Sequence, residues 1–293
     1  MYYRRKILLS LIQQLENPEK IKLQKMLFLF SKQQPAPLYH FVPYKYGCFS
    51  FQANADIFTL QKYGILNEFN NRLSVNKKTD YRDQLKPLDS EILQKVVKLY
   101  SGLSKNDLIR YTYKHYPYYA IKSTIAKDIL DKREYNSIIQ CIPKADRTVL
   151  YTIGYEGISL EEYLNKLIRN DVSILLDVRR NPVSMKYGFS KSPLLNACKG
   201  VGIEYVHIPE LGIDSFQRRN LEKQQDYDEL FDNYRKTTLK SGLDLRRKII
   251  EYVEQYNRVA LTCFEADVEK CHRYHLAHSL TKLKNWHYNI IHL

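Results

Sequence analysis

The sequence predicts two domains, a mainly α-helical N-terminal domain and an α/β C-terminal domain with a mostly parallel sheet. In the first half, apolar residues recur at helical spacing, whereas in the second half short apolar runs alternate with helical patterns. The 293 residues also exceed the usual size of one domain. We therefore expect domains at residues 1–143 and 148–293, joined by a linker from Cys141 to Arg147.

The first half is predicted to consist mainly of helices. Helices are expected at residues 5–15, 21–30, a segment ending at Gly64, 88–103 and 123–139. Residues 39–50 form an aromatic-rich loop, in which Gly47 suits a turn with positive φ.

This half also carries a motif over residues 7–73. Its members are Lys22-Leu23-Gln24-Lys25-Met26-Leu27-Phe28, Phe41, Tyr44-Lys45-Tyr46-Gly47, Ser50, Asp56, Leu60 and Gly64-Ile65-Leu66. The set resembles the Panacea (SocA-like) antitoxin-associated domain. The resemblance implies a helical binding module that recognises a protein partner or nucleic acid and is not itself a catalyst.

The second half alternates between strands and helices. Strands are expected at residues 148–153, 172–178, 203–208, 258–263 and 286–291. Ser159 and Glu162 form a capping box for the first helix, and Ser190 or Ser192 begins the second. Residues 214–256 are expected to be a surface loop followed by a helix, and a last helix runs from about Val268. The segment 172–178 is nearly all apolar, which is typical of a central parallel strand.

Polar and charged residues repeatedly follow these predicted strands. Because the carboxyl ends of parallel strands meet at one edge of a sheet, these residues are expected to line a ligand crevice. The candidates are Gly154, Glu156, Asp177, Arg179, Ser184, Glu210, Glu265, Cys271, His272 and Arg273.

The candidate carboxylates suit acid–base or nucleophilic chemistry. Glu156, Glu210 and Glu265 could supply a nucleophile or a general acid and base, although each also suits a cap or a salt bridge. Asp177 is expected to bond loop amides, and Gly154 to have a structural role beside it.

The candidate cations suit an anionic ligand. Arg179 and Arg273 could clamp a phosphate or carboxylate, with Ser184 and His272 beside them. The alternative for Arg179 is a structural pair with a nearby acid.

Cys271 is a candidate nucleophile because it lies at a helix start beside His272 and Arg273, although a buried inert thiol is the alternative.

A zinc site is also suggested by the residues Cys263, Cys271, His272 and His275. The wide gap before Cys271 and the lack of a C-x-x-C pair argue against this site. We expect no metal. Gly154-Tyr155-Glu156-Gly157 lacks the spacing of a phosphate-binding loop, so no cofactor is expected either.

The formal charge of +14, with 25 tyrosines and 11 phenylalanines, favours a nucleic acid or nucleotide as partner. The alternatives are that an AT-rich genome accounts for the lysine-rich composition and that core packing accounts for most of the aromatic residues. The absence of a long apolar run and the five scattered cysteines lead us to expect a cytoplasmic protein with reduced thiols and no membrane partner.

The second half resembles the domain of unknown function 488 family. The motifs are Thr152-Ile153-Gly154-Tyr155-Glu156, Asp177-Val178-Arg179, Pro182, Ser184, Phe189-Ser190, Tyr205, Pro209-Glu210-Leu211-Gly212, Cys263-x-Glu265 and Cys271-His272-Arg273. The resemblance covers residues 148–293 and implies a Rossmann-like α/β fold, without implying a reaction.

Two hypotheses follow. The first is an enzyme on nucleic acid or a nucleotide, in which the helical half recruits the target, arginines hold phosphate and carboxylates cleave the glycosidic bond of a base. Phosphodiester hydrolysis and thiol chemistry at Cys271 are the alternative reactions. The second is a non-catalytic sensor of an anion or nucleotide, or a DNA-binding protein, in a defence or toxin–antitoxin system.

Overall fold

The computed structural model describes residues 1–76, 79–144, 146–218 and 221–293. The chain divides into two compact units, Met1–Ile142 and Pro143–Leu293, and each has a buried apolar core. Ala145, in the linker expected from the sequence, lies outside the described residues. Within the described part of the chain, no helix is both long and apolar enough to cross a membrane.

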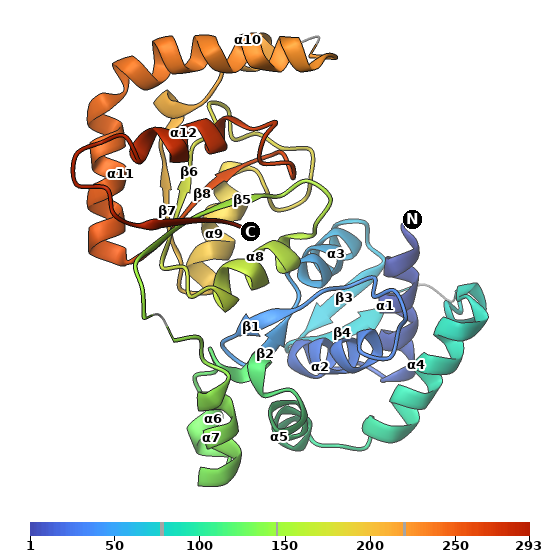
Figure 1. The fold of residues 1–293 in the computed structure, drawn as a ribbon. Coiled ribbons are helices and arrows are strands. Elements are labelled where there is room, and N and C mark those ends of the chain that lie inside the picture. The colour runs from blue at the N-terminus through green and yellow to red at the C-terminus, as the bar shows by residue number, and fades with distance from the viewer. Residues whose placement is uncertain (77–78, 145, 219–220) are drawn as a thin grey trace. The chain divides into compact units, whose positions relative to one another are not determined.

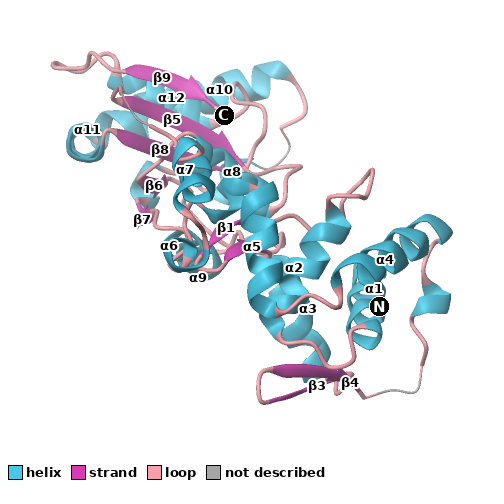
Figure 2. Cartoon of the chain, turned by 90° about the horizontal axis from the view of Figure 1, so that it is seen from below, coloured by secondary structure: helices cyan, strands magenta, loops and turns pink. Residues whose placement is uncertain are grey.

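The N-terminal unit is rich in helices. They are α1 (Tyr3–Gln14), α2 (Lys20–Ser31), α3 (Phe51–Lys62), α4 (Pro87–Tyr100), α5 (Lys105–His115), α6 (Ala126–Ile129) and α7 (Lys132–Gln140). The unit also holds two antiparallel hairpins, β1 (Val42–Tyr44) with β2 (Gly47–Phe49), and β3 (Leu66–Phe69) with β4 (Arg72–Val75). Helix α2, which Figure 2 shows among the helices of this unit, is central to the core, since most of its residues are buried.

This unit departs from the sequence-based expectation in its local elements. The aromatic-rich loop is the hairpin β1–β2, and Gly47 has a φ of +85° at its turn. Hairpin β3–β4 turns at Asn70 and Asn71, which both have positive φ and are typical of such turns. The single helix expected at residues 123–139 is two helices, because Asp131 caps α7 after α6 has ended.

The C-terminal unit contains a five-stranded, all-parallel sheet. Its strands are β5 (Val149–Gly154), β6 (Ile174–Asp177), β7 (Glu204–His207), β8 (Arg258–Cys263) and β9 (Asn289–His292), in the order β7-β6-β8-β5-β9. The helices around it are α8 (Leu160–Arg169), α9 (Lys191–Gly200), α10 (Gln224–Tyr234), α11 (Leu243–Tyr256) and α12 (His272–Leu280). The predicted mostly parallel α/β sheet is confirmed (Figure 1).

The path of the chain makes β8 the point of reversal. From β5 the chain moves through β6 to the edge strand β7, then returns to β8 between β6 and β5 and ends at the opposite edge in β9. Parallel crossovers are almost always right-handed, so the outward and returning connections cover opposite faces of the sheet. The loops after β5 and β6 therefore diverge from the loop after β8, and ligands of open α/β sheets bind in such a crevice.

The helices of this unit follow the predicted caps with two differences. Ser159 and Glu162 form the expected capping box at α8. Part of the segment expected to be surface loop is helix α10, which is held by the buried side chains of Phe231 and Tyr234. Helix α12 begins at His272, later than expected, because the preceding residues form the loop that leaves β8.

We predict that Gly154→Ala destabilises the C-terminal unit by about 1–3 kcal/mol or more, since overpacking of a tight core costs that much. A Cβ atom at Gly154 would lie 1.8 Å from the backbone carbonyl oxygen of Glu265, so the loop after β8 would have to move. Chemical denaturation checks this prediction. Gly102→Ala is the matched control, because a Cβ atom there meets nothing within 4 Å. Equal stability of the two variants would contradict the close approach.

Candidate functional site

Two adjoining hollows lie in the crevice beside β8. The first, which we call the cationic hollow, has a volume of about 540 Å³ and is lined by Arg179, Arg180, Lys186, Arg218, Glu265 and His272, among others. The second has a volume of about 420 Å³ and is lined by Glu156, Asp267 and Lys270, among others. Arg218, Phe264 and Glu265 line both hollows. The loop after β8 therefore separates them, as the reversal of the chain at this strand implies.

The loop after β8 is anchored by residues for which the sequence analysis predicts a role in ligand binding or catalysis. The buried guanidinium of Arg273 donates hydrogen bonds to the backbone carbonyls of Glu265 and Ala266. The carboxylate of Glu156 accepts a hydrogen bond from the Ala266 amide at 3.0 Å. Gly154 leaves the space that the Glu265 carbonyl occupies. In this geometry Arg273 and Glu156 position the loop, and the roles in anion binding and catalysis expected for them stay predictions.

A buried ion pair lies at the end of β6. Asp177 accepts hydrogen bonds from Nε and Nη2 of Arg179 at 2.8 and 2.5 Å, and from the Tyr205 hydroxyl at 2.6 Å. Nη1 of Arg179 donates to the Tyr155 hydroxyl and the Phe189 carbonyl, each at 2.8 Å. All three guanidinium nitrogens of Arg179 thus have protein acceptors, which matches the structural alternative for this residue.

The electrostatics of this pair follow from its burial. Burial opposes the charge of Arg179, but hydrogen bonding and the charge of Asp177 outweigh that effect and raise the pKa of Arg179. Burial, followed by the negative charge of Asp177, raises the pKa of Tyr205. Arg179 therefore stays charged and Tyr205 neutral.

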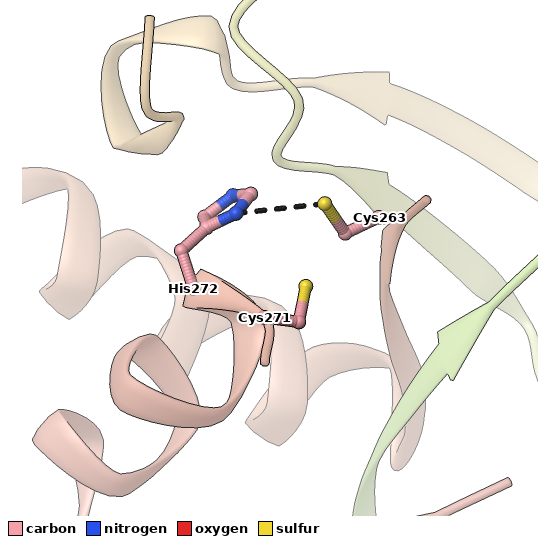
Figure 3. A group of neighbouring side chains, drawn as sticks. All are labelled: Cys263, Cys271 and His272. Carbon is pink, nitrogen blue, oxygen red and sulfur yellow. Dashed lines mark hydrogen bonds between the residues drawn. The ribbon is translucent and has the colours of Figure 1, made fainter. Parts of the chain in front are cut away.

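A second buried group, which we call the Cys–Cys–His cluster, consists of Cys263, Cys271 and His272 (Figure 3). Cys263 ends β8, whereas Cys271 and His272 open α12. The Cys263 Sγ lies 3.5 Å from Nδ1 of His272, and the thiol and imidazole groups all lie within 4.8 Å of one another. Nε2 of His272 lies 3.0 Å from the Val178 carbonyl, which can only accept. Nε2 is therefore the protonated nitrogen, and Nδ1 presents its lone pair to Cys263.

Glu265 and Arg218 connect this cluster to the cationic hollow. The Cys263 thiol donates to Oε2 of Glu265 at 3.1 Å, and Arg218 forms an ion pair with the other carboxylate oxygen. Nη2 of Arg218 also donates to Nδ1 of His272 at 2.8 Å. The side chain of Glu265 is 18% exposed, so its carboxylate links the buried cluster to solvent.

The two thiols of the cluster differ in acidity. Burial disfavours ionisation of Cys263, but a hydrogen bond with the Cys271 thiol and the positive charges of Arg218 and Arg273 lower the pKa of Cys263 to about 7. Burial, together with the neighbouring Cys263, raises the pKa of Cys271. The more acidic thiol is therefore Cys263, not the Cys271 that the sequence singled out as a nucleophile. Because Arg218 lies 45 residues before Cys263, no local pattern reveals its effect.

The structure places the remaining candidates differently. Ser184 lines the cationic hollow, where its Oγ accepts a hydrogen bond from the Lys186 amide at 3.1 Å. Glu210 is exposed in the turn Pro209–Leu211 and lines neither hollow. Glu210 is thus not brought together with the other candidate carboxylates, because this turn follows β7 at the sheet's edge.

Residues 159–280 match the model of the family described as domain of unknown function DUF488. The matched segment runs from the cap of α8 to the end of α12 and contains both the Asp177–Arg179 pair and the Cys–Cys–His cluster. No curated protein and no solved structure matches the chain. The C-terminal unit therefore carries a DUF488 domain over residues 159–280.

Proposed function

We propose that the C-terminal unit is an enzyme that hydrolyses a nucleotide or a nucleic acid in the cationic hollow. The observation that carries this proposal is the position of Glu265. Its partly exposed carboxylate lines both hollows and contacts the buried Cys–Cys–His cluster through Cys263. A polar, titratable group that joins a buried reactive cluster to a ligand-sized hollow is characteristic of catalytic sites.

The charge of the cationic hollow supports a phosphate-bearing substrate. Among the described residues that line it, Glu265 is the only acid, whereas Arg179, Arg180, Lys186 and Arg218 are cations. The guanidinium group of Arg179 is already saturated by protein acceptors, so contact with a phosphate falls to the other three cations. Guanidinium and ammonium groups bind phosphate oxygens through charge-assisted hydrogen bonds. A volume of about 540 Å³ is within the range of small-molecule sites, about 300–1,000 Å³. The hollow is therefore large enough for a nucleotide.

The apolar part of the same hollow supports a base. Tyr155 and Phe264 line it; Tyr155 is buried and stacks on Phe189, whereas Phe264 is 43% exposed. Val183 and Met185 are also highly exposed where they line the hollow. Exposed aromatic and apolar side chains beside cations can stack on a base while the cations hold its phosphate.

The geometry favours Glu265 over the other carboxylates as the acid–base residue. A glycosidase with two acting carboxylates would need a second one at the same hollow. Glu156 lines only the second hollow of the two and accepts a hydrogen bond from the Ala266 amide, and Glu210 lines neither. Proton transfer by Glu265 suits cleavage of either a glycosidic or a phosphodiester bond. The two reactions differ in their products, since the first releases a free base and the second cleaves the chain.

The N-terminal unit has a separate part in this proposal. Its resemblance to a helical binding module and the net charge of +14 support contact with a protein partner or nucleic acid. We assign it recruitment of the target and assign the reaction to the C-terminal unit.

Glu265→Gln should lower kcat by about 10²-fold or more, because an acid–base residue contributes roughly 10²–10⁴-fold to rate. Glutamine keeps the shape of the side chain but cannot exchange the proton. The measurement is turnover of a panel of nucleotides, single strands and duplexes, with free base and chain cleavage detected separately. Glu210→Gln is the matched control and should keep full activity. Binding of the ligand without turnover of any panel member by the wild type would instead support the sensor hypothesis.

Lys186→Ala should weaken nucleotide binding by about tenfold and make the affinity less dependent on salt. Nζ of Lys186 donates to the Tyr155 carbonyl at 2.8 Å, which leaves further N–H groups for a phosphate at the hollow. Calorimetric titration at two salt concentrations measures both effects. Lys199→Ala, an exposed change on α9 away from both hollows, is the control. Equal affinities of the two variants would exclude Lys186 as a phosphate contact.

A further inference from the structure

We propose that Cys263, Cys271 and His272 bind a zinc ion beside the cationic hollow. The sequence argued against a metal because Cys263 and Cys271 are separated by seven residues and form no C-x-x-C pair. The fold removes that objection, because the loop after β8 returns to place the start of α12 beside the end of β8 (Figure 3). Metal binding goes beyond the proposed hydrolase, since it needs no substrate.

The spacing of the three side chains suits a tetrahedral ion. Zinc binds cysteine sulfur at about 2.3 Å and histidine nitrogen at about 2.0–2.1 Å, so neighbouring sulfur and nitrogen ligands lie about 3.5 Å apart. The Cys263 Sγ and Nδ1 of His272 are 3.5 Å apart, and all three ligand groups are within 4.8 Å of one another. The three residues therefore need little rearrangement to share one ion.

His272 has the outer contact that a metal ligand usually makes. Ligating histidines almost always donate their second ring N–H to a carbonyl or carboxylate, which fixes the ring and its tautomer. Here Nε2 lies 3.0 Å from the Val178 carbonyl, so the ring lone pair is on Nδ1, which lies 3.5 Å from the Cys263 Sγ and accepts a hydrogen bond from Arg218. His275, the fourth candidate in the sequence, is not part of the group, because its Nδ1 faces Arg235 at 3.2 Å.

Charge and burial also suit this site. All three side chains are buried, and two buried thiolates would balance the charge of a dication once both thiols have released their protons. The protein holds the set rigidly, because Arg273 fixes the carbonyls of the intervening loop.

The site would leave one coordination position of the ion open. Three protein ligands leave the fourth tetrahedral position for water or substrate, as in catalytic zinc sites. Cys263, Glu265 and His272 line the cationic hollow. If the proposed hydrolysis takes place, water in the fourth position would lose a proton to Glu265, and the resulting hydroxide would form a bond to the anomeric carbon or the phosphorus of the substrate. The glycosidic or phosphoester bond to the leaving group would break, and Glu265 would return the proton to the leaving group. This role rests on the proposed function, whereas zinc binding does not.

One contact competes with the metal. Nη2 of Arg218 donates to Nδ1 of His272 at 2.8 Å, and this lone pair cannot serve both partners. Binding of zinc therefore requires Arg218 to give up this hydrogen bond. Arg218→Ala should keep or increase metal affinity, whereas changes to a true ligand should abolish it.

The test is metal analysis of the full chain purified under reducing conditions and then loaded with zinc. We expect about one zinc per chain, and at least a tenfold loss of affinity in Cys263→Ser, Cys271→Ser and His272→Ala. Cys198→Ala is the matched control, because Cys198 is an equally buried cysteine of the same unit outside the cluster. Circular dichroism reports whether each variant has folded.

Cobalt titration of the wild type keeps the test decisive if a variant fails to fold. Cobalt(II) bound by two thiolates and one imidazole should give a thiolate charge-transfer band and the visible spectrum of a tetrahedral ion. Lack of both zinc uptake and these bands, or unchanged binding in all three folded ligand variants, would overturn the metal site. Turnover by metal-free protein would overturn the catalytic role alone, whereas a zinc-loaded protein without turnover would count against the proposed hydrolase alone.

Discussion

The candidate site depends on how the loop after β8 is held against the end of β5. Arg273 donates hydrogen bonds to the consecutive carbonyls of Glu265 and Ala266, and Glu156 accepts a hydrogen bond from the Ala266 amide. Gly154 allows the Glu265 carbonyl to approach closer than any side chain would permit. These contacts fix the backbone that carries the Glu265 side chain, and Cys263 and Arg218 hold its carboxylate.

Burial explains why many charged residues at this edge of the sheet have structural roles. A buried arginine is tolerated only if acceptors surround its guanidinium group, since an unpaired buried charge costs several kcal/mol. Arg179 satisfies this condition with Asp177, and Arg273 largely does so with loop carbonyls. Charged groups that are still partly exposed, such as Lys186 and Glu265, retain the capacity to meet a ligand. Solvent exposure therefore distinguishes the charged residues that hold the fold from those that can contact a ligand, whereas residue type does not distinguish them.

The sequence predicted the architecture better than it predicted the roles. Residues 258–263 were expected as a strand and form β8, because an apolar run that ends in polar residues is a strong signal for a buried parallel strand. The same reasoning placed Glu265 and Glu210 at one edge, but a turn that begins at Pro209 leaves Glu210 exposed. The importance of Cys263 depends on contacts with Arg218 and His272, which only the folded chain brings together.

The negative charge of a thiolate in the Cys–Cys–His cluster can be neutralised in two ways, by Arg218 or by a metal ion. In a buried group of two thiols and an imidazole, the charge of a thiolate must be neutralised by a proton, a cation or a metal. In the structure Arg218 provides a cation, since it bridges Glu265 and the free nitrogen of His272. Zinc would supply positive charge at the thiolates themselves and would release Arg218 from His272. Metal binding and the charge of the substrate site would then be linked through this one arginine.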